Sequence, residues 1–240
     1  MITLHKTIPY WQVPDLSPFV CKLETWLRMA GIPYETALGD VRKTPTRKVP
    51  FIEDDGVLIP DSSLIIAHLK KKLGDRLDDA RLGPAEQAQC RAWKSLCETD
   101  LYFVILYQRW WRDEDFAHYR PAILRFAELA KLPALVRPLV PFLARRGIRD
   151  QLYQQGIARH RREEIDAIGC ELVTALADAL GDKPYFMGDR PCTLDASVYG
   201  MLIGILWTPF EGRLQEHTLG QAALVRYCER IRDRYWGAPS

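Results

Sequence analysis

The sequence contains no apolar run long enough to cross a bilayer. The longest run covers about residues 196–210. A membrane-spanning helix needs about 20 apolar residues, so the shorter run is more typical of a buried helix. The first residues also lack the apolar core of a secretory signal peptide. We therefore expect a soluble, cytoplasmic protein without a transmembrane segment.

Cysteines with metal-binding or redox spacing are also missing. The six cysteines are scattered, with no CxxC pair and no Cys/His spacing typical of zinc, so we expect free thiols and no metal. Neither sign of charge dominates, because 33 basic residues face 31 acidic ones. This balance gives no reason to expect a nucleic-acid partner. No glycine-rich phosphate loop and no nucleophile triad stands out.

The first 75 residues alternate between strand and helix signals. Ser17-Pro18 indicates a helix start, because serine caps free N–H groups and proline fits the first helical position. Asp54-Asp55-Gly56 between two apolar runs indicates a tight hairpin. The predicted elements are strand 2–6, helix 18–30, strand 32–37, strands 49–53 and 57–59, and helix 61–73. This order predicts a mixed sheet with helices packed on it.

From residue 85 onward the pattern is almost entirely helical. We interpret the charged, turn-rich residues 74–84 as a linker between a first domain at 1–75 and an all-helical domain at 85–240. Long helices are predicted over 85–111 and 162–180, from 193 onward, and over 221–235. The stretch 117–160 is predicted to be helical but broken by its prolines, Pro121 among them.

Three segments carry a family resemblance. They are SPFVCKLETWLRMAGIPYE at 17–35, TPTRKVPFIEDDGVLIPDSSLIIAHL at 44–69 and MGDRPCTLDASVYG at 187–200. Taken together they resemble the glutathione S-transferase superfamily, and most of all its failed-axon-connections and metaxin-like branch. The resemblance implies a thioredoxin-like N-terminal domain that holds glutathione and an all-helical C-terminal domain. It also implies that Asp195 is a buried carboxylate at the start of a core helix.

The resemblance identifies Ser17 as the candidate catalytic hydroxyl. The thiol of glutathione is mostly protonated at neutral pH, and the thiolate is the nucleophile. A hydroxyl that donates to sulfur at a helix N-terminus stabilises that anion. The alternative is that Ser17 only caps its helix. Tyr10, in the preceding loop with Trp11, is the competing hydroxyl, and both residues are candidates to line the site.

The same resemblance predicts where glutathione itself binds. Val49-Pro50 matches a cis-proline step whose backbone pairs with the cysteinyl part of the tripeptide. Asp61 and Ser62 match the pair that holds its γ-glutamyl end, because a helix start suits a carboxylate and Asp61 suits an ammonium group. A plain Asp61 cap is the alternative. Lys48 is a further candidate, for the glycine carboxylate.

Aromatic residues are dense at the end of the predicted helix 85–111. At helical spacing most of them are expected to be core residues, and one or two could line a cavity for a small apolar electrophile. Tyr102 and Trp111 are the candidates, but nine positions place them about half a turn apart on a straight helix. Only a bent helix would direct both into one cavity. The arginine-rich stretch 131–162 is interpreted as a solvated face, with an anionic lipid or protein partner as the alternative.

The expected function is therefore that of a glutathione transferase in detoxification. The protein would bind glutathione as co-substrate, lower the pKa of its thiol and join it to a small hydrophobic electrophile. The alternative is a non-catalytic binding or adaptor protein on the same fold, as the metaxin-like resemblance allows. A homodimer is expected from the resemblance only.

Overall fold

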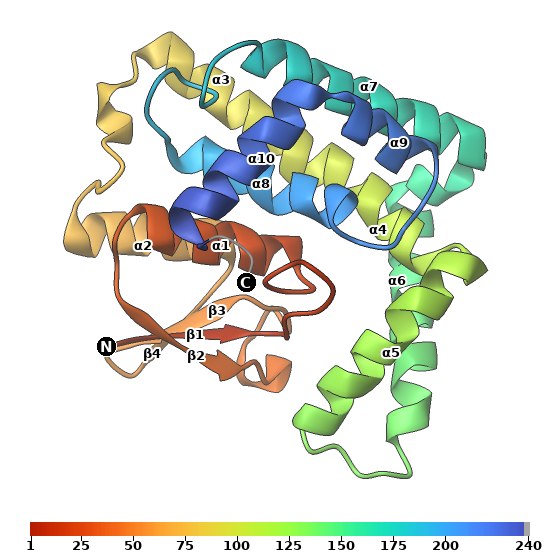
Figure 1. The fold of residues 1–240 in the computed structure, drawn as a ribbon. Helices are drawn as coiled ribbons and strands as arrows, with labels where there is room; N and C mark the ends of the chain where they lie inside the picture. Colours follow the sequence, from red (N-terminus) through yellow and green to blue (C-terminus); the bar gives the residue numbers. More distant parts are fainter. Residues whose placement is uncertain (238–240) are drawn as a thin grey trace.

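The computed structural model describes residues 1–237 and places a four-stranded sheet beneath the helices (Figure 1). The strands are β1 (Ile2–Lys6), β2 (Tyr34–Leu38), β3 (Phe51–Asp54) and β4 (Val57–Pro60). Their order in the sheet is β2-β1-β3-β4, with β1 parallel to β2 and β3 antiparallel to both of its neighbours. The predicted mixed sheet is confirmed.

Helices α1 (Pro18–Met29) and α2 (Ser62–Leu73) lie between the sheet and the helices above it (Figure 1). Both begin at side-chain caps that the sequence predicts. Ser17 Oγ accepts a hydrogen bond from the Val20 N–H at 3.4 Å. Asp61 Oδ1 accepts from the N–H groups of Ser63 and Leu64 at 2.8 and 3.2 Å. These caps fix both helix starts, because they satisfy N–H groups that have no partner within the helix.

The second half of the described chain is helical. Its helices are α3 (Pro84–Ser95), α4 (Tyr102–Trp110), α5 (Asp113–Leu129), α6 (Val140–Gln155), α7 (Arg162–Leu180), α8 (Thr193–Leu206), α9 (Arg213–Gly220) and α10 (Ala222–Tyr235). The predicted helix 85–111 is not uniform, because a π-helical turn at Leu96–Leu101 separates α3 from α4. The expected break at Pro121 is wrong, since α5 continues through that residue. Buried residues on both sides of it, Tyr119 and Ile123, anchor the helix against the core.

The two halves of the chain meet where α1 packs against α8. A Cβ at residue 200 of α8 would lie 2.7 Å from the carbonyl oxygen of Pro18 and 2.8 Å from the backbone nitrogen of Lys22. Gly200 therefore allows the two backbones to approach more closely than any other residue would. This contact fixes the first turn of α1, and with it Ser17, against the helical half.

Asp195, in the first turn of α8, is fully buried, as predicted. Its carboxylate accepts hydrogen bonds from the backbone N–H groups of Phe186 and Cys192 at 2.9 and 2.8 Å. The Tyr227 hydroxyl also donates to it, at 3.1 Å. Burial raises the pKa of this carboxyl. The segment before α8 is thus tied to the centre of the helical core.

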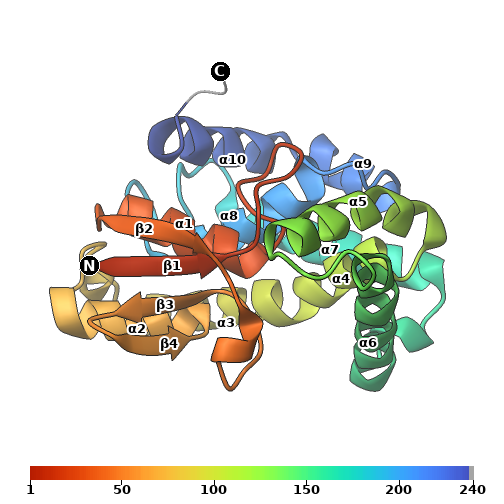
Figure 2. The ribbon, with the colours of Figure 1, turned by 90° about the horizontal axis from the view of Figure 1, so that it is seen from below.

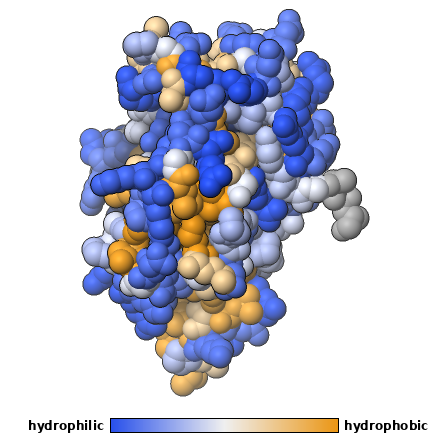
Figure 3. Space-filling view, turned by 90° about the vertical axis from the view of Figure 1, so that its left-hand side faces the viewer, coloured by the Kyte–Doolittle hydropathy of each residue, from blue (hydrophilic) through white to orange (hydrophobic). Residues whose placement is uncertain are grey.

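Helices α5 and α6 form a hairpin that extends beside the sheet (Figures 1 and 2). Several arginines of this region cover aromatic rings, as the solvated-face interpretation expects: Arg145 lies over Phe116 at 4.3 Å and Arg149 over Trp111 at 4.5 Å. Hydrophobic side chains gather at the lower end of the molecule, which the hairpin forms (Figure 3). The exposed apolar residues there include Leu135, Val136, Leu139, Phe142 and Leu143. No helix within residues 1–237 is long and apolar enough to cross a membrane.

Candidate active site

Ser17 is held in place by the loop that precedes it. Its backbone N–H donates to Oδ1 of Asp15 at 2.8 Å, and the hydroxyl of Thr7, just after β1, donates to the same oxygen. Asp15 is 2% exposed. Burial raises the pKa of its carboxyl to about 7. The Ser17 hydroxyl accepts from Val20 and keeps its own proton free to donate.

The predicted glutathione-binding residues share one cavity of about 280 Å³, which we call the polar cavity. Its lining residues are Phe19, Thr46, Lys48, Val49, Pro50, Asp61 and Ser62. The Val49-Pro50 bond is cis, as predicted. Three separate parts of the chain therefore converge here: the first turn of α1, the loop before β3 and the start of α2.

The corner of the polar cavity at the start of α2 suits a zwitterion. Ser62 is 3% exposed, and its hydroxyl has no hydrogen-bond partner among residues 1–237. Asp61 uses one carboxylate oxygen for the helix cap, while the other has no partner in the described chain. A ligand carboxylate would meet the Ser62 hydroxyl at the positive end of the α2 dipole, and a ligand ammonium would meet the second oxygen of Asp61.

A second cavity of about 310 Å³, the apolar cavity, opens beside Ser17. It lies between the first turn of α1 and helices α4, α5 and α6. Its lining residues are Thr7, Leu16, Ser17, Pro18, Tyr102, Ile105, Leu106, Arg109, Trp110, Tyr119, Ile123, Phe126, Val140, Ala144 and Ile148. Apart from Thr7, Ser17, Arg109 and the two tyrosines, these side chains are hydrophobic, as a site for a small apolar molecule requires.

The two cavities meet at the first turn of α1. Ser17 and Pro18 line the apolar cavity, and the next residue, Phe19, lines the polar one. The rings of Phe19 and Tyr102 pack edge to face with centroids 4.8 Å apart. Tyr102 also lines the apolar cavity, so this ring pair forms the boundary between the two spaces. Both cavities therefore border the same turn of α1, one on each side of this ring pair.

Three of the residues proposed from the sequence lie outside both cavities. Trp111 stacks on Tyr107 and lies on the opposite side of its helix from Tyr102. This placement agrees with the half-turn spacing, because the helix does not bend enough to direct both side chains into one cavity. Tyr10 and Trp11 pack against each other. Trp11 also contacts Phe210 with ring centroids 5.2 Å apart, so the loop before Ser17 is anchored in the core.

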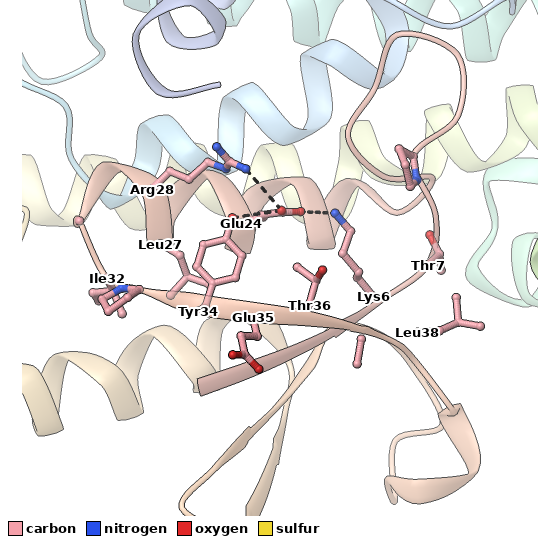
Figure 4. Close-up of a pocket in the computed structure, with 14 residues that line it drawn as sticks. Lys6, Thr7, Glu24, Leu27, Arg28, Ile32, Tyr34, Glu35, Thr36 and Leu38 are labelled. Atoms are coloured by element: carbon pink, nitrogen blue, oxygen red, sulfur yellow. Dashed lines mark hydrogen bonds and ion pairs between the residues drawn. The ribbon is translucent and has the colours of Figure 1, made fainter. Parts of the chain in front are cut away.

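A third, open hollow lies between α1 and β2 and contains a buried carboxylate (Figure 4). Glu24 accepts from the Tyr34 hydroxyl at 3.0 Å and from the Lys6 ammonium, and it lies 3.9 Å from a nitrogen of Arg28. The chain's own side chains therefore balance this charge. We interpret the hollow as the site of a structural ion pair that joins α1 to β1 and β2.

Sequence reasoning missed several residues of the apolar cavity. The side chains from α5 and α6 reach it only because the hairpin folds back beside α1. Thr7, Tyr119 and Arg109 are the polar residues among those missed. A signal for Arg109 was present, since it is the first cation after the apolar and aromatic run at 101–107. Thr46 was likewise missed in the polar cavity.

Comparison with known proteins identifies the family. The patterns described as "Glutathione S-transferase N-terminal domain" and "Glutathione S-transferase, C-terminal domain" match residues 18–116 and 169–231. The chain is 36% identical over 241 residues to isoprene-epoxide glutathione S-transferase of Rhodococcus sp. (strain AD45), covering 98% of this chain and 99% of that protein. It is 30% identical to Failed axon connections of Drosophila melanogaster, covering 79% of this chain and 46% of that protein.

The fold agrees with these sequence comparisons. A glutathione S-transferase of Methylobacterium radiotolerans, solved in complex with glutathione sulfonate, superposes with a TM-score of 0.60 at 20% identity. The superposition covers 98% of this chain and 92% of the other. Sequence and architecture therefore lead to one conclusion: the chain belongs to the glutathione S-transferase family.

Proposed function

We propose that this transferase binds glutathione in the polar cavity, with its thiol at Ser17, and joins the sulfur to a small apolar electrophile in the apolar cavity. The observation that carries the proposal is the junction of the two cavities at the first turn of α1. A tripeptide whose γ-glutamyl end lies at Asp61 and Ser62 and whose backbone pairs with Val49 would direct its thiol toward that junction.

The chemistry required of the chain is to favour the thiolate. Ser17 caps α1 through its oxygen and can still donate its proton to sulfur. The sulfur anion at this place also meets the positive end of the α1 dipole. Both effects lower the pKa of the bound thiol, so that more of it is ionised at neutral pH. Tyr10 lines neither cavity, which favours Ser17 over Tyr10 for this role.

The electrophile is expected to be small and apolar. The apolar cavity has a volume of about 310 Å³ and a largely hydrophobic lining. The Rhodococcus relative is named as an isoprene-epoxide glutathione S-transferase. Small alkyl epoxides are therefore the first substrates to test. A cytoplasmic, detoxifying role and a homodimer complete the proposal, and sedimentation of the purified protein would test the dimer.

Glutathione binding and thiol ionisation can be measured on the same protein. Calorimetry gives the affinity, and the thiolate absorbance against pH gives the pKa of the bound thiol. Ser17→Ala should raise that pKa by about one to two pH units, because a hydrogen bond to a charged group contributes roughly 1.5–3 kcal/mol. The control is Ser95→Ala, at an exposed serine at the end of α3.

The outcomes separate the enzyme from an adaptor. An unchanged pKa in Ser17→Ala, with a raised pKa in Tyr10→Phe, would assign the role to the other hydroxyl. Since Ser17→Ala also loses the cap of α1, its melting temperature checks that the fold persists. If the wild-type protein binds no glutathione, the proposal fails and a non-catalytic adaptor on this fold takes its place.

A further inference from the structure

Arg109 of α4 is a buried cation without a carboxylate partner. The residue is 5% exposed, and its guanidinium forms no ion pair with any residue in 1–237. Nη1 donates to the backbone oxygen of Leu16 and Nη2 to that of Gly204, both at 3.0 Å. Nε is buried and has no partner. Arginine stays charged even when burial lowers its pKa.

An unpaired buried cation is costly, because desolvation of a charge is not recovered by neutral partners alone. The fold nevertheless makes room for it. A Cβ at residue 204 would lie 2.5 Å from Nη2 of Arg109, so the glycine at this position allows the guanidinium to occupy its place. The arrangement is understandable if the cation has a further partner that is present only when the site is occupied.

The place of that partner is the apolar cavity. Arg109 lines this cavity together with Ser17. Its guanidinium donates to the backbone oxygen of Leu16, the residue that precedes Ser17 in the chain. Tyr102 and Tyr119 line the same cavity, and neither hydroxyl has a hydrogen-bond partner among residues 1–237. Burial raises the pKa of Tyr119 to about 12 and raises that of Tyr102, so both remain proton donors. Three donors thus border a space whose other walls are mostly hydrophobic.

We propose that Arg109 stabilises an oxygen on which negative charge develops, and that this site is built for strained cyclic ethers such as epoxides. This inference rests on the proposed function. The thiolate sulfur of glutathione attacks a ring carbon, the S–C bond forms and the C–O bond breaks. The electron pair stays on the oxygen, which becomes an alkoxide and then takes a proton from water. Arg109 donates hydrogen bonds to that oxygen, and Tyr102 and Tyr119 are placed to assist it.

A matched pair of electrophiles tests this assignment. In 1,2-epoxybutane the oxygen takes the full charge, whereas 1-iodobutane releases a diffuse iodide that accepts hydrogen bonds poorly. Arg109→Met should lower kcat/KM for the epoxide by about 100- to 1000-fold, the usual effect of losing a donor to a developing oxyanion. The kcat/KM for 1-iodobutane should fall much less than that for the epoxide, and the affinity for glutathione and the pKa of its bound thiol should match those of wild type.

A second variant guards against failure of Arg109→Met to fold. Gly204→Ala keeps the charge but displaces the guanidinium, because the new Cβ would overlap Nη2. It should lower the epoxide rate selectively, in the same direction as Arg109→Met. The matched control is Gly220→Ala, at a helical glycine of α9 where a Cβ meets no atom within 4 Å. This control should leave both rates unchanged.

The outcomes also separate the inference from the proposed function. Equal losses with both electrophiles in Arg109→Met and Gly204→Ala would mean that Arg109 only ties α4 to α8, and would overturn the inference. Unchanged epoxide turnover in both variants would overturn it as well. A wild-type protein that converts 1-iodobutane but not 1,2-epoxybutane would refute the inference while the proposed function stands. A wild-type protein that binds no glutathione would refute both.

Discussion

Replacement of Asp195 by alanine should destabilise the protein strongly without touching the glutathione site. The side chain is fully buried and accepts hydrogen bonds from Phe186 N–H, Cys192 N–H and the Tyr227 hydroxyl. Tyr227 also donates to the backbone oxygen of Asp195 at 3.0 Å. The hydroxyl therefore keeps a partner in the variant, and only the two backbone N–H groups lose theirs.

The expected loss of stability follows from those two groups. A buried donor left without a partner costs about 1–3 kcal/mol, so Asp195→Ala should lower the free energy of unfolding by about 2–6 kcal/mol. Asp195→Asn should lose less, because its amide retains one acceptor. Urea denaturation followed by far-UV circular dichroism measures both values. Asp189→Ala, at an exposed aspartate in the same segment, is the control.

Two results would refute this reasoning. A loss below about 1 kcal/mol in Asp195→Ala would mean that the two N–H groups find other partners or water. A loss as large in Asp189→Ala would mean that the segment, and not the buried carboxylate, carries the stability. Glutathione affinity of the folded variant should match that of wild type, since Asp195 lines neither cavity.

Three further predictions concern single side chains. Ser62→Ala should weaken glutathione binding about ten- to a hundredfold in calorimetry, with a smaller effect on saturated turnover, because its carboxylate partner is the same in ground and transition states; an unchanged affinity would remove Ser62 from the site. Asp15 has a pKa raised to about 7 by burial, so its contribution to stability is complete below about pH 4 and is lost as pH rises through 7. Between pH 5 and pH 8, Asp15→Asn should therefore lose less free energy of unfolding than wild type. Equal losses in the two proteins would contradict the raised pKa of Asp15. Cys90 is half-buried while the other five thiols are buried, and a hydrogen bond from Cys192 lowers the pKa of Cys90; a thiol reagent should label Cys90 first in the native protein and six thiols after denaturation, and native labelling elsewhere would argue against this order.

The sequence by itself determined those features that depend on neighbouring residues. The caps at Ser17 and Asp61, the hairpin turn at Asp55-Gly56 and the buried cap at Asp195 all follow from hydrogen bonds or backbone angles within a few residues. The motifs around them were sufficient to indicate the family. Five of the residues that line the polar cavity came from the resemblance, and the structure brings these five together: Lys48, Val49, Pro50, Asp61 and Ser62.

Only the tertiary structure decided the composition of the apolar cavity. The local sequence pattern did not distinguish Tyr102 from Trp111 as a cavity residue. Only the packing of α4 directs Tyr102 into the apolar cavity and Trp111 away from it. The contributions of α5 and α6 depend on a hairpin that folds back beside α1, and the burial of Arg109 depends on a glycine 95 residues away. Such contacts are set by the packing of distant surfaces, which no short window of sequence contains.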